Sequence, residues 1–411
     1  MENPVKSDCK DSRPYRLQNT IQHYPWGTRN DEAFIAHLLG VEPDLDQPFA
    51  ELWMGVHPNA PSLVIDPEEG LKDLSTWISE NPRERLSMDT PDLAGVNLPY
   101  LFKVLSADEA LSIQAHPNKA QAEQLHDRDD VHYPDDNHKP EVAIAIDYLD
   151  ALVGFISSER YAGVLKSFPE LVDIMGAGPT GPAHLKQGVL KLLEKWKNKQ
   201  SEVISTIKQI ESRLNVKDLR NDIESLFLDQ IQKCGNQDIG LLFIFLLNRV
   251  QLAAGEAIFL APGVPHAYLR GNIIECMANS DNVVRLGLTA KFCDSQALSE
   301  ILVFDEQENY LVETASDGYL TEYLSPTKEF SVKSLNLLQG ESRAFSFRTK
   351  LTMFLLLDGE VSLHWGDKVN SCTSVYRRGD SFITPANLQS FTLQARNHSK
   401  IFIVDIPDIE T

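Results

Sequence analysis

Four polar residues of this sequence belong to the types that coordinate a divalent metal ion. Gln114 and His116 lie in the run SIQAHPNK, Glu141 follows HKP, and His266 lies in APGVPHAY. Two imidazoles, one carboxylate and one amide oxygen suit a borderline divalent cation, and zinc is the best match. The leading hypothesis is therefore a zinc site, with one ion per chain, built from positions far apart in the sequence.

The spacing and the charge of these residues fit that hypothesis. Gln114 and His116 are separated by one residue, so on a strand their side chains project from the same face. One carboxylate against Zn²⁺ leaves about one net positive charge, which a neutral amide ligand preserves. Such a site would stabilise an anion that forms during a reaction.

Short apolar runs punctuated by Pro, Gly, Asn and Asp predict the strands that must position these residues. Residues 15–158 are mostly of this kind, whereas the apolar residues after Glu159 recur at steps of three and four, as in helices. The helical set is Leu185, Val189, Leu192, Trp196, Val203, Ile207, Ile210 and Leu214. Strand character returns near Gly255 and continues to about Ile406. The expected fold class is mainly β with an inserted α-helical domain.

One phrase of the sequence resembles the second half of the cupin motif, in which a strand, a turn and a second strand place a His inside a small barrel. It consists of Gly255, the pair Pro262-Gly263 and His266. The C-terminal stretch repeats it with Gly379-Asp380 and Pro385, but Gln389 stands where the His would fall. The resemblance implies two cupin-type jelly-roll β-barrels. We expect a catalytic barrel from residues 15–158 plus 250–318, an inserted helical domain over 159–249, and a C-terminal degenerate barrel without metal over 319–411.

Longer matches carry a closer resemblance. The runs SIQAHPNK, NHKPE, PHAY and IIECMANSDNVVRLGLTAKF, together with YPWG and AELWMGVHP near the N-terminus, closely resemble type I phosphomannose isomerases. These are zinc enzymes that interconvert mannose 6-phosphate and fructose 6-phosphate. The likeness extends along the chain in the same order. It implies a zinc-dependent isomerase whose partner is a small-molecule sugar phosphate.

The resemblance also implies roles for individual residues. Gln114, His116, Glu141 and His266 would be the zinc ligands, and Arg285 in NVVRLGL would be catalytic. The remaining residues would contact the phosphate or the sugar, or complete the wall of the pocket: Trp26, Glu51, Lys103, Ser112, Tyr268, Asp281 and Lys291.

The chemistry of an aldose to ketose isomerisation explains why such groups are needed. Removing the proton next to the carbonyl builds negative charge on oxygen in a cis-enediolate, which a metal ion can stabilise. Moving that proton between C1 and C2 requires a base that works near neutral pH. Lys139, two residues before Glu141, is one candidate, and Glu275 is the other. The sequence does not separate them.

Two other functions stay open at this stage. Two His and one carboxylate are also the ligands of iron dioxygenases, so a metal-dependent cupin dioxygenase is one alternative. The other is a non-catalytic sugar-binding cupin, which would not need a Lys, a Glu and an Arg beside the metal. Neither GxGxxG nor GxxxxGK[ST] occurs, which argues against a nucleotide cofactor. The acidic run from His126 to His138 lacks the spacing of an EF-hand, and we expect it to be a solvated loop near the active site.

Composition excludes several classes of partner. The 59 acidic residues exceed the 38 basic ones, giving a net charge of -21 that disfavours nucleic acid and anionic membranes. The longest apolar run, Ile239 to Leu247, is too short to cross a membrane, and we interpret it as a buried helix. Five scattered cysteines argue against a disulfide framework, and the N-terminus lacks the apolar core of a signal peptide. We expect a cytoplasmic protein that acts as a monomer.

Overall fold

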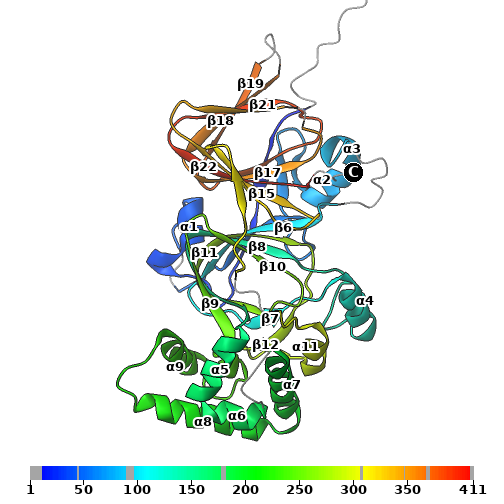
Figure 1. Cartoon of the computed structure of the whole chain (residues 1–411). Coiled ribbons are helices and arrows are strands. Elements are labelled where there is room, and N and C mark those ends of the chain that lie inside the picture. Colours follow the sequence, from blue (N-terminus) through cyan, green and yellow to red (C-terminus); the bar gives the residue numbers. More distant parts are fainter. Residues whose placement is uncertain are drawn as a thin grey trace, which may run out of the picture. The chain divides into compact units, whose positions relative to one another are not determined.

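The computed structural model describes residues 12–43, 46–88, 97–176, 182–305, 309–346, 348–366 and 371–407. The chain divides into two compact units. The first unit consists of Met1–Ser106, Ile274–Asn279 and Val312–Thr411, and the second of Ala107–Ile273 and Ser280–Leu311. Strands dominate the first unit, whereas the longest helices belong to the second (Figure 1).

The main sheet of the first unit is antiparallel and combines the two ends of the chain. In spatial order its strands are β13 (Thr314–Ser316), β14 (Leu320–Tyr323), β15 (Ser331–Leu337), β22 (Ser399–Asp405), β17 (Thr352–Asp358), β20 (Ser381–Thr384), β1 (Tyr15–Gln18), β4 (Leu63–Asp66) and β5 (Gly70–Asp73). Strand β1 is inserted between β20 and β4, with Arg16 opposite both Phe382 and Ile65. The N-terminal strand therefore completes a sheet built largely from the last hundred residues.

A smaller sheet packs on this one through an apolar core. Its strands, in spatial order, are β16 (Ser342–Phe345), β21 (Phe391–Ala395), β18 (Glu360–Gly366) and β19 (Ser371–Arg377). Leu335 and Phe354 of the main sheet share one buried cluster with Leu363 and Leu393 of the smaller sheet. Alternate residues of each strand contribute to this core, as in two sheets stacked face to face. Whether such sheets close into barrels stays a prediction.

The other described elements of the first unit include three further strands and short helices. Strands β2 (Thr20–Gln22), β3 (Glu51–Gly55) and β6 (Tyr100–Ala107) pair antiparallel in that order. The helical elements are η1 (Asn30–Glu32), α1 (Phe34–Leu39), α2 (Leu74–Glu80) and α3 (Pro82–Arg85). All five residues of β3 and all eight of β6 are buried, which suits central strands covered on both faces.

The strands of the second unit carry the expected metal ligands. They are β7 (Ile113–Ala115), β8 (Glu141–Phe155), β9 (Leu247–Ala253), β10 (Ala257–Leu260), β12 (Val284–Gly287) and residues 266–273 of β11 (His266–Ala278), whose last residues belong to the first unit. The long strand β8 pairs with β10 at its start and with β9 along its second half. Strand β7 pairs with both β11 and β12. The strand, turn and strand predicted around Pro262-Gly263 are present as β10 and β11.

The helical block predicted after Glu159 is confirmed. Its helices are α5 (Ser158–Ser167), α6 (Pro169–Met175), α7 (Pro182–Asn198), α8 (Gln200–Asn215) and α9 (Asp222–Cys234), which pack on one another (Figure 1). Their apolar residues form one buried cluster that also contains Ile113 and Phe155 of the strands. Two further helices, α4 (Lys119–Arg128) and α11 (Ser295–Ile301), follow β7 and β12. Capping boxes at Asn118 and Asn221 fix where α4 and α9 begin.

Two features differ from the expectations, and the three-part domain division stays a prediction. In the first compact unit, β1, β4 and β5 share a sheet with C-terminal strands. The run from Ile239 to Leu247 is buried as predicted, but only α10 (Gly240–Phe243) is helical and β9 begins at Leu247. Cys234, Cys276 and Cys293 are free, whereas Cys372 is disulfide-bonded. Among the described residues, no helix has the length and apolar character needed to span a membrane.

Candidate metal centre

Three of the four expected ligands meet in the second unit. The ligand atoms of His116, Glu141 and His266 all lie within 4.8 Å of one another. His116 directly follows β7, Glu141 is the first residue of β8, and His266 is the first residue of β11. Each side chain is 1–2% exposed, so strand ends hold all three in a dry interior. Residues 150 positions apart are thereby brought to one point by strand pairing.

The ligand atoms themselves have no hydrogen-bond partner within the described parts of the chain. These atoms are His116 Nε2, Glu141 Oε2 and His266 Nε2. A buried polar atom without a partner costs about 1–3 kcal/mol, so three converging on one point indicate a bound cation that would satisfy them all. Two His and one carboxylate form one of the usual ligand sets of catalytic zinc sites, which keep a further position for water or substrate. The donors therefore fit a zinc ion.

Backbone carbonyls set the orientation of both imidazoles. His116 Nδ1 lies 2.8 Å from the carbonyl oxygen of Asn282, and His266 Nδ1 lies 2.9 Å from that of Val264. A carbonyl oxygen can only accept, so each Nδ1 donates its proton and each Nε2 keeps its lone pair for a metal. The carbonyl oxygen of His116 in turn accepts from the backbone N–H of Gly263 at 2.7 Å.

The charges around Glu141 keep the cluster in its metal-binding protonation state. Oε2 of Glu141 faces the imidazoles of His116 and His266 at 3.5 and 3.4 Å, while Oε1 faces Lys139 Nζ at 3.2 Å. Burial would raise the pKa of Glu141, but the positive charge of Lys139 opposes this effect, and that pKa is well below its usual value. Burial lowers the pKa of His116 to about 4, so its imidazole is neutral at pH 7.

Gln114 and Arg285 lie beside this cluster in the sheet. Gln114 of β7 is the register partner of His266 on one side and of Arg285 on the other. Directly opposed residues of paired strands share a face, so the three side chains project the same way. Gln114 Oε1 lies 3.5 Å from Ser112 Oγ, at the limit of a hydrogen bond. Burial lowers the pKa of the half-buried Arg285, whose guanidinium nevertheless stays charged at neutral pH. The role of Gln114 as a fourth ligand stays a prediction.

The acidic loop from His126 to His138 supports the cluster. Asp135 accepts hydrogen bonds from Ser280 Oγ, the backbone N–H of Asp281, Asn282 Nδ2 and the backbone N–H of Asn137, at 2.8, 2.7, 3.1 and 2.9 Å respectively. Asn282 is the residue whose carbonyl oxygen holds His116. The acidic run from His126 to His138 therefore reaches the metal ligands through one residue. The donors come from the polar run NSDN that follows β11, far from Asp135 in the sequence, so no local pattern indicated this contact.

The other expected residues of the second unit differ in their exposure. Tyr268 is buried on β11, two residues after His266, and the two ring centres are 6.3 Å apart. Asp281 and Lys291 are exposed and belong to the loops before and after β12. Ser112 directly precedes β7 and is partly buried. Each lies within a few residues of a strand that carries a ligand or Arg285.

The first unit contains a second buried charged cluster. Lys103 Nζ of β6 lies 3.1 Å from Glu275 Oε2 and 3.7 Å from Glu51 Oε2. Trp53 of β3 donates from Nε1 to Glu51, and Lys103 lies over the Trp53 ring, 5.3 Å from its centre. Lys103, Glu51 and Glu275 are each buried, whereas Trp26 is partly exposed and stacks on Tyr24. Burying a lysine with two carboxylates costs desolvation free energy, and such buried charged groups cluster at functional sites.

Known proteins combine the same fold with the same sequence features. A family profile described as "Phosphomannose isomerase type I, catalytic domain" matches residues 15–157. The mannose-6-phosphate isomerase of Homo sapiens is 38% identical over 346 residues, which cover 78% of this chain and 81% of the human protein. This chain belongs to the type I phosphomannose isomerase family. Mannose-6-phosphate isomerase 2 of Arabidopsis thaliana is 35% identical over 402 residues, covering 91% of this chain and 89% of the plant protein.

Crystal structures of phosphomannose isomerase share the fold. A substitution mutant from Salmonella typhimurium matches with a TM-score of 0.82 and 27% sequence identity, covering 96% of this chain and 99% of that chain. A crystal structure of mannose 6-phosphate isomerase bound with zinc and yttrium matches with a TM-score of 0.81 and covers 96% of this chain and all of the other. The family and the mainly β fold class predicted from the sequence are thus confirmed.

Proposed function

We propose that this member of the phosphomannose isomerase family is a zinc-dependent enzyme that interconverts mannose 6-phosphate and fructose 6-phosphate through a cis-enediolate. The observation that carries the proposal is the buried group of His116, Glu141 and His266, with Lys139 beside it, in a chain whose relatives bear this enzyme name. A binding protein would not need a buried lysine so close to the ligands.

His116, Glu141 and His266 would hold the zinc ion, with Gln114 as the proposed fourth ligand. When bound, zinc would supply Lewis acidity that stabilises negative charge developing on a substrate oxygen. The protein contributes the setting for this effect. Water is excluded around the ligands by burial, and both imidazoles are already held in the required orientation, so little reorganisation is needed when charge develops.

The proton transfer between C1 and C2 requires a group that can accept and return a proton. Lys139 is our first candidate, because its Nζ lies 3.2 Å from Glu141 Oε1 and so is held beside a ligand. Glu275 is the alternative. Its buried carboxylate forms an ion pair with Lys103 at 3.1 Å. In either case the group takes the proton from C2 of the aldose and returns it to C1, or runs the same steps in reverse.

Arg285 is proposed to stabilise the enediolate without moving protons, because a guanidinium stays charged and presents several donors. Its place opposite Gln114 in the sheet supports this role. The residues proposed to bind the phosphate and the sugar, on the likeness to the family, are Trp26, Glu51, Lys103, Ser112, Tyr268, Asp281 and Lys291.

The first experiment measures conversion of mannose 6-phosphate to fructose 6-phosphate by the purified protein before chelation, after chelation, and after zinc is added back. Loss and recovery of activity would support a zinc isomerase. A folded, zinc-loaded sample without turnover would refute the proposal and favour a non-catalytic sugar-binding cupin. Oxygen consumption by an iron-loaded sample would instead indicate the dioxygenase.

A second experiment separates the two candidate bases. Lys139→Met should abolish exchange of the C2 proton of mannose 6-phosphate with solvent while the bound zinc is retained. Lys119→Met is the matched control, since this exposed lysine pairs with Asp136 at the surface. If exchange is normal in Lys139→Met but lost in Glu275→Gln, the base is Glu275.

A further inference from the structure

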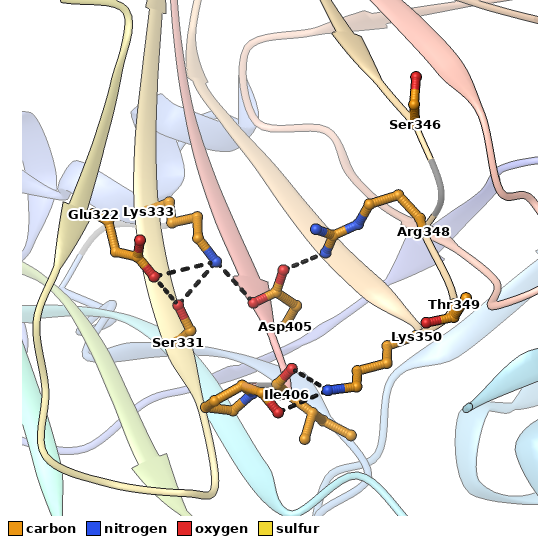
Figure 2. A pocket seen from close by; sticks show the side chains of 10 residues that line it. Glu322, Ser331, Lys333, Ser346, Arg348, Thr349, Lys350, Asp405 and Ile406 are labelled. Atoms are coloured by element: carbon orange, nitrogen blue, oxygen red, sulfur yellow. Dashed lines mark hydrogen bonds and ion pairs between the residues drawn. The ribbon is translucent and has the colours of Figure 1, made fainter. Parts of the chain in front are cut away.

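A polar cavity of about 460 Å³ lies in the first unit, outside every residue assigned above. Its walls come from strands β14, β15 and β22, from Ser346, and from residues 348–350 (Figure 2). This volume is within the range of cavities that bind small molecules. None of its lining residues belongs to the metal centre or to the Lys103 cluster.

Charged side chains from separate segments converge in this cavity. Lys333 Nζ and Arg348 Nη2 bind opposite oxygens of Asp405, Lys333 to Oδ1 at 3.0 Å and Arg348 to Oδ2 (Figure 2). Asp405 is buried, so one carboxylate holds two cations in fixed positions. Lys350 Nζ donates to the carbonyl oxygens of Ile406 and Pro407 at 3.4 and 2.7 Å.

The balance of charge in the cavity differs from that of the chain. Among the described residues that line it, three cations face two carboxylates, Asp405 and Glu322, whereas the whole chain has a net charge of -21. A guanidinium and two ammonium groups within one cavity suit a phosphate group, because each provides several donors and full charge. A potential set by near neighbours is little affected by distant acidic residues once salt screens them.

The same cavity also offers groups that suit hydroxyls. Ser331 Oγ donates to Glu322 Oε1 at 3.0 Å and receives a bond from Lys333, and Ser346 and Thr349 supply further hydroxyls. Carboxylates accept hydrogen bonds from the hydroxyl groups of a polyol, and inorganic phosphate has no such alcohol groups. We infer that this cavity binds a small phosphorylated polyol, with the phosphate near Arg348 and Lys350 and the hydroxyls near Asp405 and Glu322.

The test uses glycerol 3-phosphate, with inorganic phosphate and glycerol as its two halves, in titration calorimetry at matched ionic strength. Glycerol 3-phosphate should bind more tightly than either half. Arg348→Gln and Lys350→Gln should each weaken its binding about tenfold, the usual effect of losing a charged hydrogen bond. Lys328→Gln, which changes an exposed lysine of the same unit, should leave binding unchanged.

Two further measurements distinguish binding in this cavity from loss of the fold and from binding at the proposed active site. Arg348→Gln removes one partner of Asp405, so its fold is checked by circular dichroism. Lys350→Gln provides an independent variant, because Lys350 Nζ donates to the backbone carbonyls of Ile406 and Pro407. The KM for mannose 6-phosphate should be unchanged in both. Unchanged binding of glycerol 3-phosphate in both folded variants, or its complete displacement by mannose 6-phosphate with a matching rise in KM, would overturn the inference.

Discussion

The aspartate that organises the loop beside the metal centre allows a quantitative prediction. The carboxylate of Asp135 accepts four hydrogen bonds, one of them from Asn282, whose carbonyl oxygen lies 2.8 Å from His116 Nδ1. Asn282 Nδ2 also donates to the backbone carbonyls of Asp135 and Asn137, at 2.6 and 2.9 Å. Asp135→Ala removes all four bonds without touching a ligand. Loss of a partner that orients a metal ligand typically weakens metal binding 10- to 100-fold, which corresponds to about 1.4–2.7 kcal/mol. We expect zinc affinity to fall within this range.

The assay is competition for zinc against a chromogenic chelator, with thermal unfolding of the metal-free protein measured in parallel. Hydrogen bonds to a charged group contribute about 1.5–3 kcal/mol, so the metal-free variant should also be less stable. Asp136→Ala is the matched control, because Asp136 is the next residue in the chain and its exposed carboxylate pairs with Lys119 at 3.2 Å. A folded Asp135→Ala protein that binds zinc as tightly as the control would refute the reasoning, since the Asp135 carboxylate would then not orient His116.

Three further outcomes are expected from the same region. His266→Ala should leave dialysed protein with less than one zinc per chain by elemental analysis, because one of three converging ligands is lost; full retention would contradict the assignment. Gly263→Ala should lower stability by about 1–3 kcal/mol in thermal unfolding, because Gly263 has φ +80° and an added Cβ would lie 2.5 Å from the carbonyl oxygen of Ile301. The free energy of unfolding of the metal-free protein should fall by up to about 3 kcal/mol as the pH falls from 6.5 to 4. In the unfolded state His116 takes up a proton near pH 6.5, whereas in the folded state it does so only near its pKa of about 4. His116→Gln should flatten this dependence of stability on pH. An unchanged pH profile in that variant would contradict the assignment to His116.

The sequence predicted the convergence of three residues better than their surroundings. His116, Glu141 and His266 are three of the four expected ligands and lie together in the structure, and the Pro-Gly turn before His266 predicted the strands β10 and β11. The support from Asp135 was not predicted, because a hydrogen bond between residues 147 positions apart leaves no local pattern. Likewise, the pairing of Lys103 with Glu275 depends on which strands the fold brings together.

The limits of the fold prediction have the same origin. Helical periodicity located α7 and α8 because their buried faces recur every three or four residues. Strand patterns around Tyr15 predicted β structure correctly, but alternation along a strand does not specify its partner. Nothing near β1 indicates that it pairs with β20. Similarly, an apolar run such as Ile239 to Leu247 is buried in either conformation, so hydrophobicity alone did not reveal where the helix ends.

The insertion of β1 between β4 and β20 has a consequence for the order of assembly during synthesis. Arg16 pairs with Phe382, so the main sheet of the first unit stays incomplete until most of the chain has left the ribosome. Closing so long a segment is slow, and until then β1 lacks a neighbour on the edge that does not pair with β4. The second unit is complete in sequence by Leu311 and can assemble earlier. A nascent chain stalled before β20 would therefore expose unpaired strand edges, and chaperone binding at this stage would protect it from aggregation.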